Sequence, residues 1–440
     1  MTTDAIEKSL ETTGLNAPRI VIIALCFLIW VVDAFDIVAM SVAAPAISAE
    51  WGINHSEMGI VFTAALIGMT IGAIVLAPLA DRFGRRKLLL AALFALALSV
   101  FSVTLVSSIT QLIIVRLITG LAIGSILASA TTVASEFAPT KYRAAAVAIT
   151  ALGYSVGATL VGPIANGILE NNDWRVIFAL GGGLTAIIFM LTFIAMPESI
   201  QFLKLNAAND ERALEKINKV LSKIKCPPVD TLPVQVTASV KPAGGPMALT
   251  RPEHLMRSIM LWICIFAALF ITYYALSWTP TLFIEAGYER AEGIRALTLF
   301  AFMGIFGILT VTFAFLKFSA TRTVAAILLA GGLLMLVFPM LKGSSLTVLY
   351  VMFGSIGFLV AAANGGLYSL AAQLYPASIR ATGVGWGMGI GRLGAVVAPV
   401  LVGYLLTKDW TMYQFFGIFA VPYLLTAWAA LYLTAYKISK

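Results

Sequence analysis

The chain has 440 residues, of which 60% are hydrophobic and 11% are charged. Soluble domains carry about 25% charged residues, so the composition excludes a soluble globular protein and predicts a polytopic membrane protein. The net charge of +8 does not indicate a nucleic-acid-binding protein. The basic residues lie in short loops beside apolar segments, where they set the membrane topology.

The amino-terminal residues, Met1 to Pro18, are polar and mixed in charge. They lack the basic region and the cleavage site of a removable signal peptide. We therefore expect the first apolar segment to act as an uncleaved insertion signal.

Two acidic residues, Asp33 and Asp36, interrupt this first apolar run, which extends from Arg19 to Pro45. A carboxylate at the centre of a membrane helix costs roughly 2.5–3.5 kcal/mol on insertion scales. Residues three apart share one helix face, so the pair is predicted to face a polar cavity. Either acid is a candidate proton carrier, and Asp36 is favoured because it lies nearer the outer face.

Apolar runs of helical length predict twelve membrane spans in two sets of six. The fold class is therefore an all-α membrane protein. The spans are expected near residues 19–46, 56–80, 88–107, 110–137, 144–168, 174–196, 257–284, 293–316, 323–342, 345–373, 380–406 and 410–435.

A polar segment separates the two sets of spans and predicts three domains. These are an amino-terminal six-helix bundle (1–196), a cytoplasmic linker (197–256) and a carboxy-terminal six-helix bundle (257–440). Residues 210–221 of the linker have apolar positions at helical spacing, which predicts an amphipathic helix on the membrane surface or, equally, a solvated linker helix. Residues 227–246 contain Pro and Gly and are expected to form a flexible connector.

The distribution of basic residues predicts the orientation. If the amino terminus is inside, 22 of the 29 Lys and Arg residues fall on the cytoplasmic side and only five in outer loops. This asymmetry places both termini and the linker in the cytoplasm.

An internal repeat relates the two halves. The motif Glu-x-x-Pro-x-x-x-Arg runs from Glu136 to Arg143, and Gln-x-x-Pro-x-x-x-Arg ends at Arg380, 237 residues later. Each copy lies between the fourth and fifth spans of its half. Two six-helix halves in parallel repeat are the architecture of major facilitator transporters. We predict gating roles for Glu136, Arg143 and Arg380; charges at a Pro-terminated helix end are the alternative.

The loop between the second and third spans, residues 81–87, reads Asp-Arg-Phe-Gly-Arg-Arg-Lys. It resembles the Asp-Arg-x-Gly-Arg-Arg signature of the major facilitator superfamily. Gly84 permits a tight turn, Asp81 can pair with a basic residue, and Arg85 and Arg86 hold the loop in the cytoplasm. These four are predicted gating residues; positive-inside charge alone is the alternative, although it requires neither the Asp nor the Gly.

Two arginines, Arg116 and Arg392, lie deep within predicted spans. Counting a rise of about 1.5 Å per residue puts both near the depth of Asp33. Intramembrane charges pair with each other or line a pathway, and the planar guanidinium suits a carboxylate. Arg392 is predicted to anchor an anionic substrate and Arg116 to tune the acids and contact the substrate; a structural ion pair is the alternative for each.

Three aromatic residues complete the predicted substrate-binding set. Tyr273 and Tyr274 lie in the seventh span, and Trp386 lies in the glycine-rich segment that precedes Arg392. Their rings could stack on an aromatic substrate, although residues of an interfacial aromatic belt are the alternative for the seventh span. The glycines allow close helix packing and leave room for a ligand beside Arg392.

Taken together, these motifs resemble the aromatic acid:proton symporter family. The resemblance rests on Asp-Ala-Phe-Asp at 33–36, Pro-Glu-Ser at 197–199 and the segment from Tyr375 to Gly394. Ala34 stands where that family usually has Gly. The resemblance implies uptake of a small aromatic carboxylate with a proton across a bacterial-type inner membrane, with the helix-one acids, Asp81, Gly84, Arg116, Glu136, Arg380 and Arg392 as functional positions.

We expect a transporter rather than an enzyme, because the sequence shows no nucleophile–base pair and no metal-ligand constellation. The expected partners are an organic carboxylate, a proton and the lipid bilayer, with no cofactor, no metal and no nucleic acid, and the protein is expected to be a monomer. A non-aromatic mono- or dicarboxylate substrate, export instead of import, and a non-transporting receptor on the same fold stay as alternatives.

Overall fold

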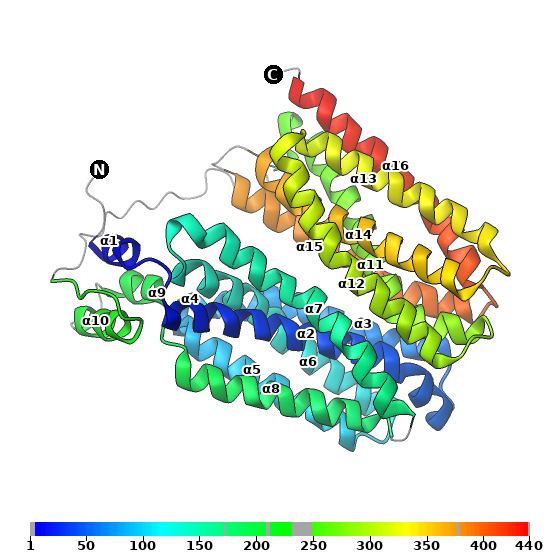
Figure 1. Cartoon of the computed structure of the whole chain (residues 1–440), viewed down its shortest axis with the longest axis horizontal. Helices are drawn as coiled ribbons and strands as arrows, with labels where there is room; N and C mark the ends of the chain where they lie inside the picture. Colours follow the sequence, from blue (N-terminus) through cyan, green and yellow to red (C-terminus); the bar gives the residue numbers. More distant parts are fainter. Residues whose placement is uncertain (1–4, 171–172, 208–211, 231–248, 376–378, 439–440) are drawn as a thin grey trace. The chain divides into compact units, whose positions relative to one another are not determined.

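The computed structural model describes residues 5–170, 173–207, 212–230, 249–375 and 379–438, and these ranges contain helices and no strand (Figure 1). Within them, twelve helices are long and apolar enough to cross a membrane. The predicted fold class and the number of spans are therefore confirmed. The segments 210–211, 231–246 and 376–378, which carried parts of the predicted linker and of the second repeat motif, lie outside the described residues.

The long helices agree with the predicted spans to within a few residues at most ends. They are α2 (Ala17–Trp51), α3 (His55–Ile71), α5 (Arg85–Ser102), α6 (Ile109–Phe137), α7 (Arg143–Leu169), α8 (Arg175–Ala195), α11 (Pro252–Glu285), α12 (Arg290–Lys317), α13 (Ala320–Val337), α14 (Leu346–Leu374), α15 (Arg380–Leu406) and α16 (Met412–Ile438).

The second span is the one whose interior differs from the prediction. It was expected to be continuous to residue 80, but a π-helical turn, η1 (Gly72–Leu76), follows α3, and a short helix, α4 (Leu79–Phe83), completes it. A π-helical turn widens the backbone by one residue and is common at functional sites. Here it immediately precedes the predicted gating loop.

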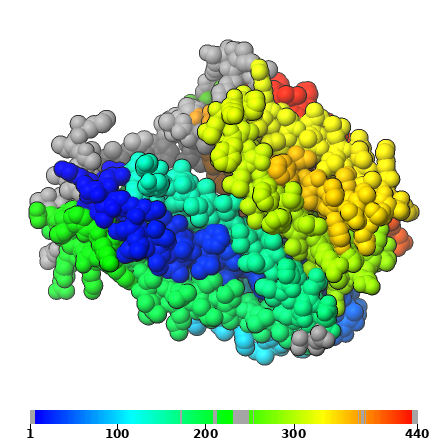
Figure 2. Space-filling view, viewed as in Figure 1, coloured from blue at the N-terminus to red at the C-terminus, as the bar shows by residue number. Residues whose placement is uncertain are grey.

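Three short helices lie outside the membrane spans: α1 (Ala5–Thr12), α9 (Ile200–Leu205) and α10 (Ala213–Lys223). Helix α10 is the predicted linker helix, whereas α1 was not predicted. The amino-terminal segment contacts the end of α10, since Ser9 Oγ donates to Pro227 O at 2.6 Å and Asn16 Nδ2 donates to Ile224 O at 2.7 Å. The blue amino-terminal surface accordingly adjoins the green linker surface (Figure 2).

Contacts divide the chain into two compact units that do not follow the sequence order. Unit 1 comprises residues 1–36, 67–157 and 175–239, and unit 2 comprises 37–66, 158–174 and 240–440. Helix α2 therefore contributes its first part to unit 1 and its last part to unit 2. The three domains predicted from the sequence stay a prediction.

Within unit 1, small residues bring helices into backbone contact. A Cβ on Gly68 or Gly72 would collide with the backbone of α6 at Leu117 or Leu121, and one on Gly124 would collide with Met69 O. Helix α6 is thus held tightly against α3 and η1. This packing fixes the position of Arg116, which lies on the same helix.

Within unit 2, an aromatic cluster joins α11, α14 and α16. The rings of Tyr274 and Phe416 are 5.3 Å apart, and those of Phe353 and Phe416 are 5.4 Å apart, both in edge-on geometry. Such arrangements add about 0.5–1.5 kcal/mol per pair beyond the burial of area. The cluster makes α11 and α16 a rigid support for the residues on the opposite face of α11.

Candidate functional site

The acidic pair of α2 meets Arg116 of α6 inside unit 1. Arg116 Nη1 lies 2.8 Å from both Oδ1 and Oδ2 of Asp36, and each side chain is only 2% exposed. The attraction between the two charges offsets part of the cost of removing them from water. The sequence placed Arg116 at the depth of the acids, and the structure shows that its partner is Asp36.

Asp33 lies one turn before Asp36 and is 1% exposed. Phe35, between the two acids, packs toward α8, because a Cβ on Gly181 would lie 3.0 Å from its ring. The acids and Phe35 therefore occupy different faces of α2, and the aromatic side chain serves packing. The role of the acids in proton transfer stays a prediction.

Arg392 lies on α15 in unit 2, close enough to the Tyr368 hydroxyl of α14 to interact with it electrostatically. Its Nη1 is buried and has no hydrogen-bond partner among the described residues. Gly385 and Gly389 share its helix face, and a Cβ at either position would meet no described atom within 4 Å. The glycines thus leave open space on the face of α15 that carries Arg392.

The other glycines of the same segment have a different role. A Cβ on Gly391 would collide with Ile265, and one on Gly394 would collide with Phe266 O, both on α11. The segment therefore combines close helix packing on one side with open space on the other, as its sequence predicted.

The three predicted aromatic contacts have different surroundings. Tyr274 is fully buried among Phe415, Phe416 and Phe419 of α16, which explains its burial by packing alone. Tyr273 is partly exposed, and Trp386 is 45% exposed with its ring 6.3 Å from that of Trp262. The substrate-binding roles of these three side chains stay predictions.

Sequence reasoning missed two polar residues on α14, Asn364 and Tyr368. They are four residues apart and so share a helix face; Asn364 Nδ2 donates to Thr272 Oγ1 of α11 at 2.8 Å. The signal was present in the sequence, since an amide in the middle of a membrane span is unfavourable unless it has a polar partner. We refer to Thr272, Asn364, Tyr368 and Arg392 as the second-half polar cluster.

The predicted gating loop forms an ion-pair network in unit 1. Arg85 pairs with Glu136 at the end of α6, and its Nη2 lies 3.6 Å from Asp81 Oδ1. Ser199 Oγ donates to Glu136 Oε2 at 2.5 Å. Two predicted gating motifs, the loop after α4 and the end of α6, are thus directly joined, and the start of α9 completes the junction.

The backbone conformation and the neighbouring Glu198 both favour a glycine at position 84. Gly84 has φ of +104°, and a Cβ there would lie 2.6 Å from Glu198 Oε2. The other oxygen, Glu198 Oε1, accepts from the backbone N–H of Arg86 at 2.9 Å. Arg86 in turn donates through Nε to Met196 O at 2.6 Å. The turn is therefore clamped to the end of α8.

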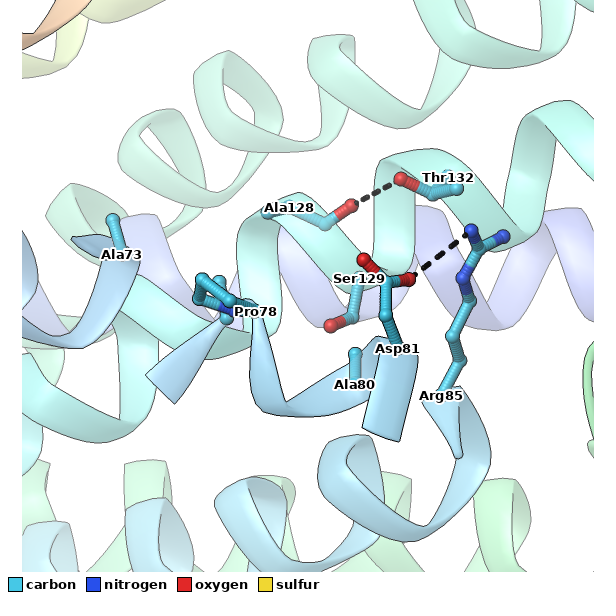
Figure 3. A pocket seen from close by; sticks show the side chains of 9 residues that line it. Ala73, Pro78, Ala80, Asp81, Arg85, Ala128, Ser129 and Thr132 are labelled. Atoms are coloured by element: carbon cyan, nitrogen blue, oxygen red, sulfur yellow. Dashed lines mark hydrogen bonds and ion pairs between the residues drawn. The ribbon is translucent and has the colours of Figure 1, made fainter. Parts of the chain in front are cut away.

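A cavity of about 290 Å³ lies beside this network and between η1, α4 and α6. In Figure 3 the side chains of Asp81 and Arg85 point toward each other at its edge. Its remaining lining residues are small or weakly polar, which leaves room for movement of the loop. The full lining is Ala73, Ala77, Pro78, Ala80, Asp81, Arg85, Ala128, Ser129 and Thr132.

The other two predicted gating residues are Arg143 and Arg380, each at the start of a helix. Arg143 is the first residue of α7 and is exposed, and it interacts electrostatically with Glu11 of α1. Arg380 is the first residue of α15, but its side chain lies outside the described part of the structure. In the corresponding loop of the second half, Lys317 and Arg322 have no carboxylate partner among the described residues.

At the other end of the helices, unit 2 joins segments of α2 and α3 to α11 and α15. Ser41 Oγ donates to Ser277 O at 2.9 Å, and Trp278, fully buried, donates through Nε1 to Pro399 O at 3.1 Å. His55 Nε2 lies 3.3 Å from Glu285 Oε1. His55 and Trp278, whose rings are 6.1 Å apart, are therefore both part of a packed helix junction.

The sequence profile described as the Major Facilitator Superfamily matches residues 25–320. This chain belongs to that superfamily. A 4-hydroxybenzoate transporter, PcaK, from Acinetobacter baylyi is 32% identical over 90% of this chain and 87% of its own length, and a gallate transporter from Pseudomonas putida is 28% identical over 97% and 94%. These relatives confirm the resemblance to the aromatic acid:proton symporter family.

Among solved structures, that of a D-xylose–proton symporter superposes with a TM-score of 0.72, covering 95% of this chain and 97% of the other. The sequence identity is 16%, so the likeness concerns the fold alone. This protein, as a member of the Major Facilitator Superfamily, is therefore a multi-pass membrane transporter and not an enzyme.

Proposed function

We propose that this protein takes up a small aromatic carboxylate together with a proton by alternating access, as a monomer in a bacterial inner membrane with both termini in the cytoplasm. The observation that carries the proposal is the full-length similarity to proteins named as 4-hydroxybenzoate, gallate and benzoate transporters. A charged guanidinium inside a membrane protein, Arg392, supports an anionic substrate, because intramembrane charges pair or line a pathway.

The Asp36–Arg116 pair supports the coupling step. Protonation of Asp36 removes the negative charge that holds Arg116, and the freed guanidinium then seeks another anion. Loss of the proton restores the pair. A substrate carboxylate and a proton would therefore be bound together, which is the requirement for symport.

The two ends of the helices support alternating access. In the proposed topology, the Ser41–Ser277 and His55–Glu285 contacts of unit 2 lie at the outer face and correspond to a closed outer pathway. The Arg85–Glu136 network of unit 1 lies at the cytoplasmic face. We propose that Asp81, Gly84, Arg85, Arg86, Glu136, Arg143 and Arg380 control the cytoplasmic opening.

The test is uptake of radiolabelled 4-hydroxybenzoate into proteoliposomes with an imposed inward pH gradient. We expect accumulation above equilibrium that a protonophore abolishes. Accumulation that does not depend on the pH gradient contradicts proton coupling. Accumulation driven only by an outward proton gradient indicates proton antiport, which would export the substrate from a cell. Competition by unlabelled benzoate but not by succinate is expected; the reverse order would replace the aromatic substrate with a dicarboxylate.

A further inference from the structure

The orientation of the Asn364 amide is fixed by its hydrogen bonds. Thr272 Oγ1 donates its only proton to Ala268 O at 2.8 Å, so toward Asn364 it can act only as an acceptor. Asn364 Nδ2 supplies the donor at 2.8 Å. Since the nitrogen must face Thr272, the carbonyl oxygen, Oδ1, faces the other way.

Asn364 Oδ1 is buried and has no hydrogen-bond partner among the described residues. Buried polar atoms are nearly always satisfied, and an exception in a native structure requires an explanation. A carbonyl oxygen can be satisfied only by a donor. The position therefore needs a donor O–H or N–H group, which a water molecule or a ligand can bring.

Arg392 presents the complementary requirement in the same polar cluster. Its buried Nη1 also lacks a hydrogen-bond partner among the described residues, and its helix, α15, packs against α14, which carries Asn364 and, one turn later, Tyr368. Residues four apart on a helix are separated by about 6 Å along its axis. A benzene ring with substituents at opposite positions has comparable length.

We infer that Asn364 is a specificity-determining residue that accepts a hydrogen bond from a ring hydroxyl of the substrate, whose carboxylate is held by Arg392. This inference rests on the proposed function and narrows the substrate to hydroxylated aromatic carboxylates. Thr272 acts as a positioning residue, because it holds the amide with its oxygen toward the ligand. An unsubstituted benzoate would leave Oδ1 unsatisfied.

The test is equilibrium binding of 4-hydroxybenzoate and of benzoate to the purified full-length protein and to Asn364→Leu, which keeps the side-chain volume. The unmodified protein is expected to prefer 4-hydroxybenzoate. Because one neutral hydrogen bond is lost, this preference should fall about three- to tenfold in the variant, while benzoate binding stays unchanged. Ser369→Ala is the matched control, since Ser369 is on the same helix, exposed, and bonded only to Gly365 O.

Thr272→Val is a second variant that tests the inference even if Asn364→Leu does not fold. It frees the amide to rotate and should lower the same preference by a smaller factor. An unchanged preference in both variants, or an equal loss for both acids, overturns the inference and leaves the proposed function intact. If the unmodified protein binds neither acid, the proposed function fails and the inference fails with it.

Discussion

The intramembrane arginines of the two units differ in what surrounds them. In unit 1, Arg116 is matched by Asp36 at 2.8 Å. In unit 2, no carboxylate lies within ion-pair distance of Arg392 among the described residues, and its buried Nη1 has no hydrogen-bond partner there. Because buried charges are normally paired, the difference supports the proposal that Arg392, unlike Arg116, is paired by a bound anion.

The largest expected effect comes from breaking the Asp36–Arg116 pair. Asp36→Ala removes the carboxylate that is bonded to the buried Arg116, which should destabilise the protein by about 3–5 kcal/mol. Thermal unfolding in detergent measures this loss. The double variant Asp36→Ala/Arg116→Leu should recover most of it, and Glu215→Gln, an exposed change on α10, should have none. A double variant no more stable than the single one would show that the pair is not responsible.

Changing Arg392 should affect substrate binding more than the stability of the fold. Arg392→Lys keeps the charge but loses the planar donor pair, so carboxylate affinity should fall about tenfold to a hundredfold, the equivalent of one charge-assisted hydrogen bond. Equilibrium binding of 4-hydroxybenzoate measures the change. Arg295→Lys, on an exposed side chain of α12, is the control. Unchanged affinity in the Arg392 variant would refute its role as the anchor.

A smaller effect is expected at the cytoplasmic turn. Gly84→Ala combines a positive φ with a collision against Glu198 and should cost about 1–3 kcal/mol, with slower transport. Gly287→Ala separates the two causes, because Gly287 has φ of +86° and no described atom near its added Cβ. Equal destabilisation in the two variants would mean that contact with Glu198 contributes nothing.

The smallest expected effect concerns the tie between α1 and the loop after α6. Hydrogen bonds from the Thr140 side chain and backbone hold the pKa of Glu11 below its usual value. A carboxylate whose pKa is lower in the folded than in the unfolded state stabilises the fold at pH values above its unfolded-state pKa. This stability is lost as the pH falls through the folded-state pKa of Glu11. Thr140→Val should therefore lower the unfolding temperature slightly at pH 7.

The difference between Thr140→Val and the unmodified protein should shrink in acid, because Glu11 is then protonated in both. Thr312→Val, which removes a hydroxyl bonded only within its own helix, should show no such pH dependence. A Thr140 effect that is constant with pH would exclude the carboxylate as its cause.

The gating loop at residues 81–87 and the corresponding loop of the second half show what the residue types of a loop can predict about its interactions. Asp81, Gly84 and Arg85 predicted a structured turn, and the structure supplies its partners, Glu136 and Glu198. The loop at 317–322 lacks the Asp and the Gly, and its basic residues have no carboxylate partner among the described residues. Residue types thus indicated which loop forms a network, but the partners come from distant helices.

The sequence by itself determined the membrane class and the twelve spans, because hydrophobicity and helical rise are local properties. Only the tertiary structure decided that Asp36 holds Arg116 and that Glu198 packs against Gly84. It also decided that Thr272 holds the amide of Asn364 so that its oxygen points away from Thr272 and has no hydrogen-bond partner among the described residues. These features depend on which helix faces pack together, and spacing along a single helix does not specify them.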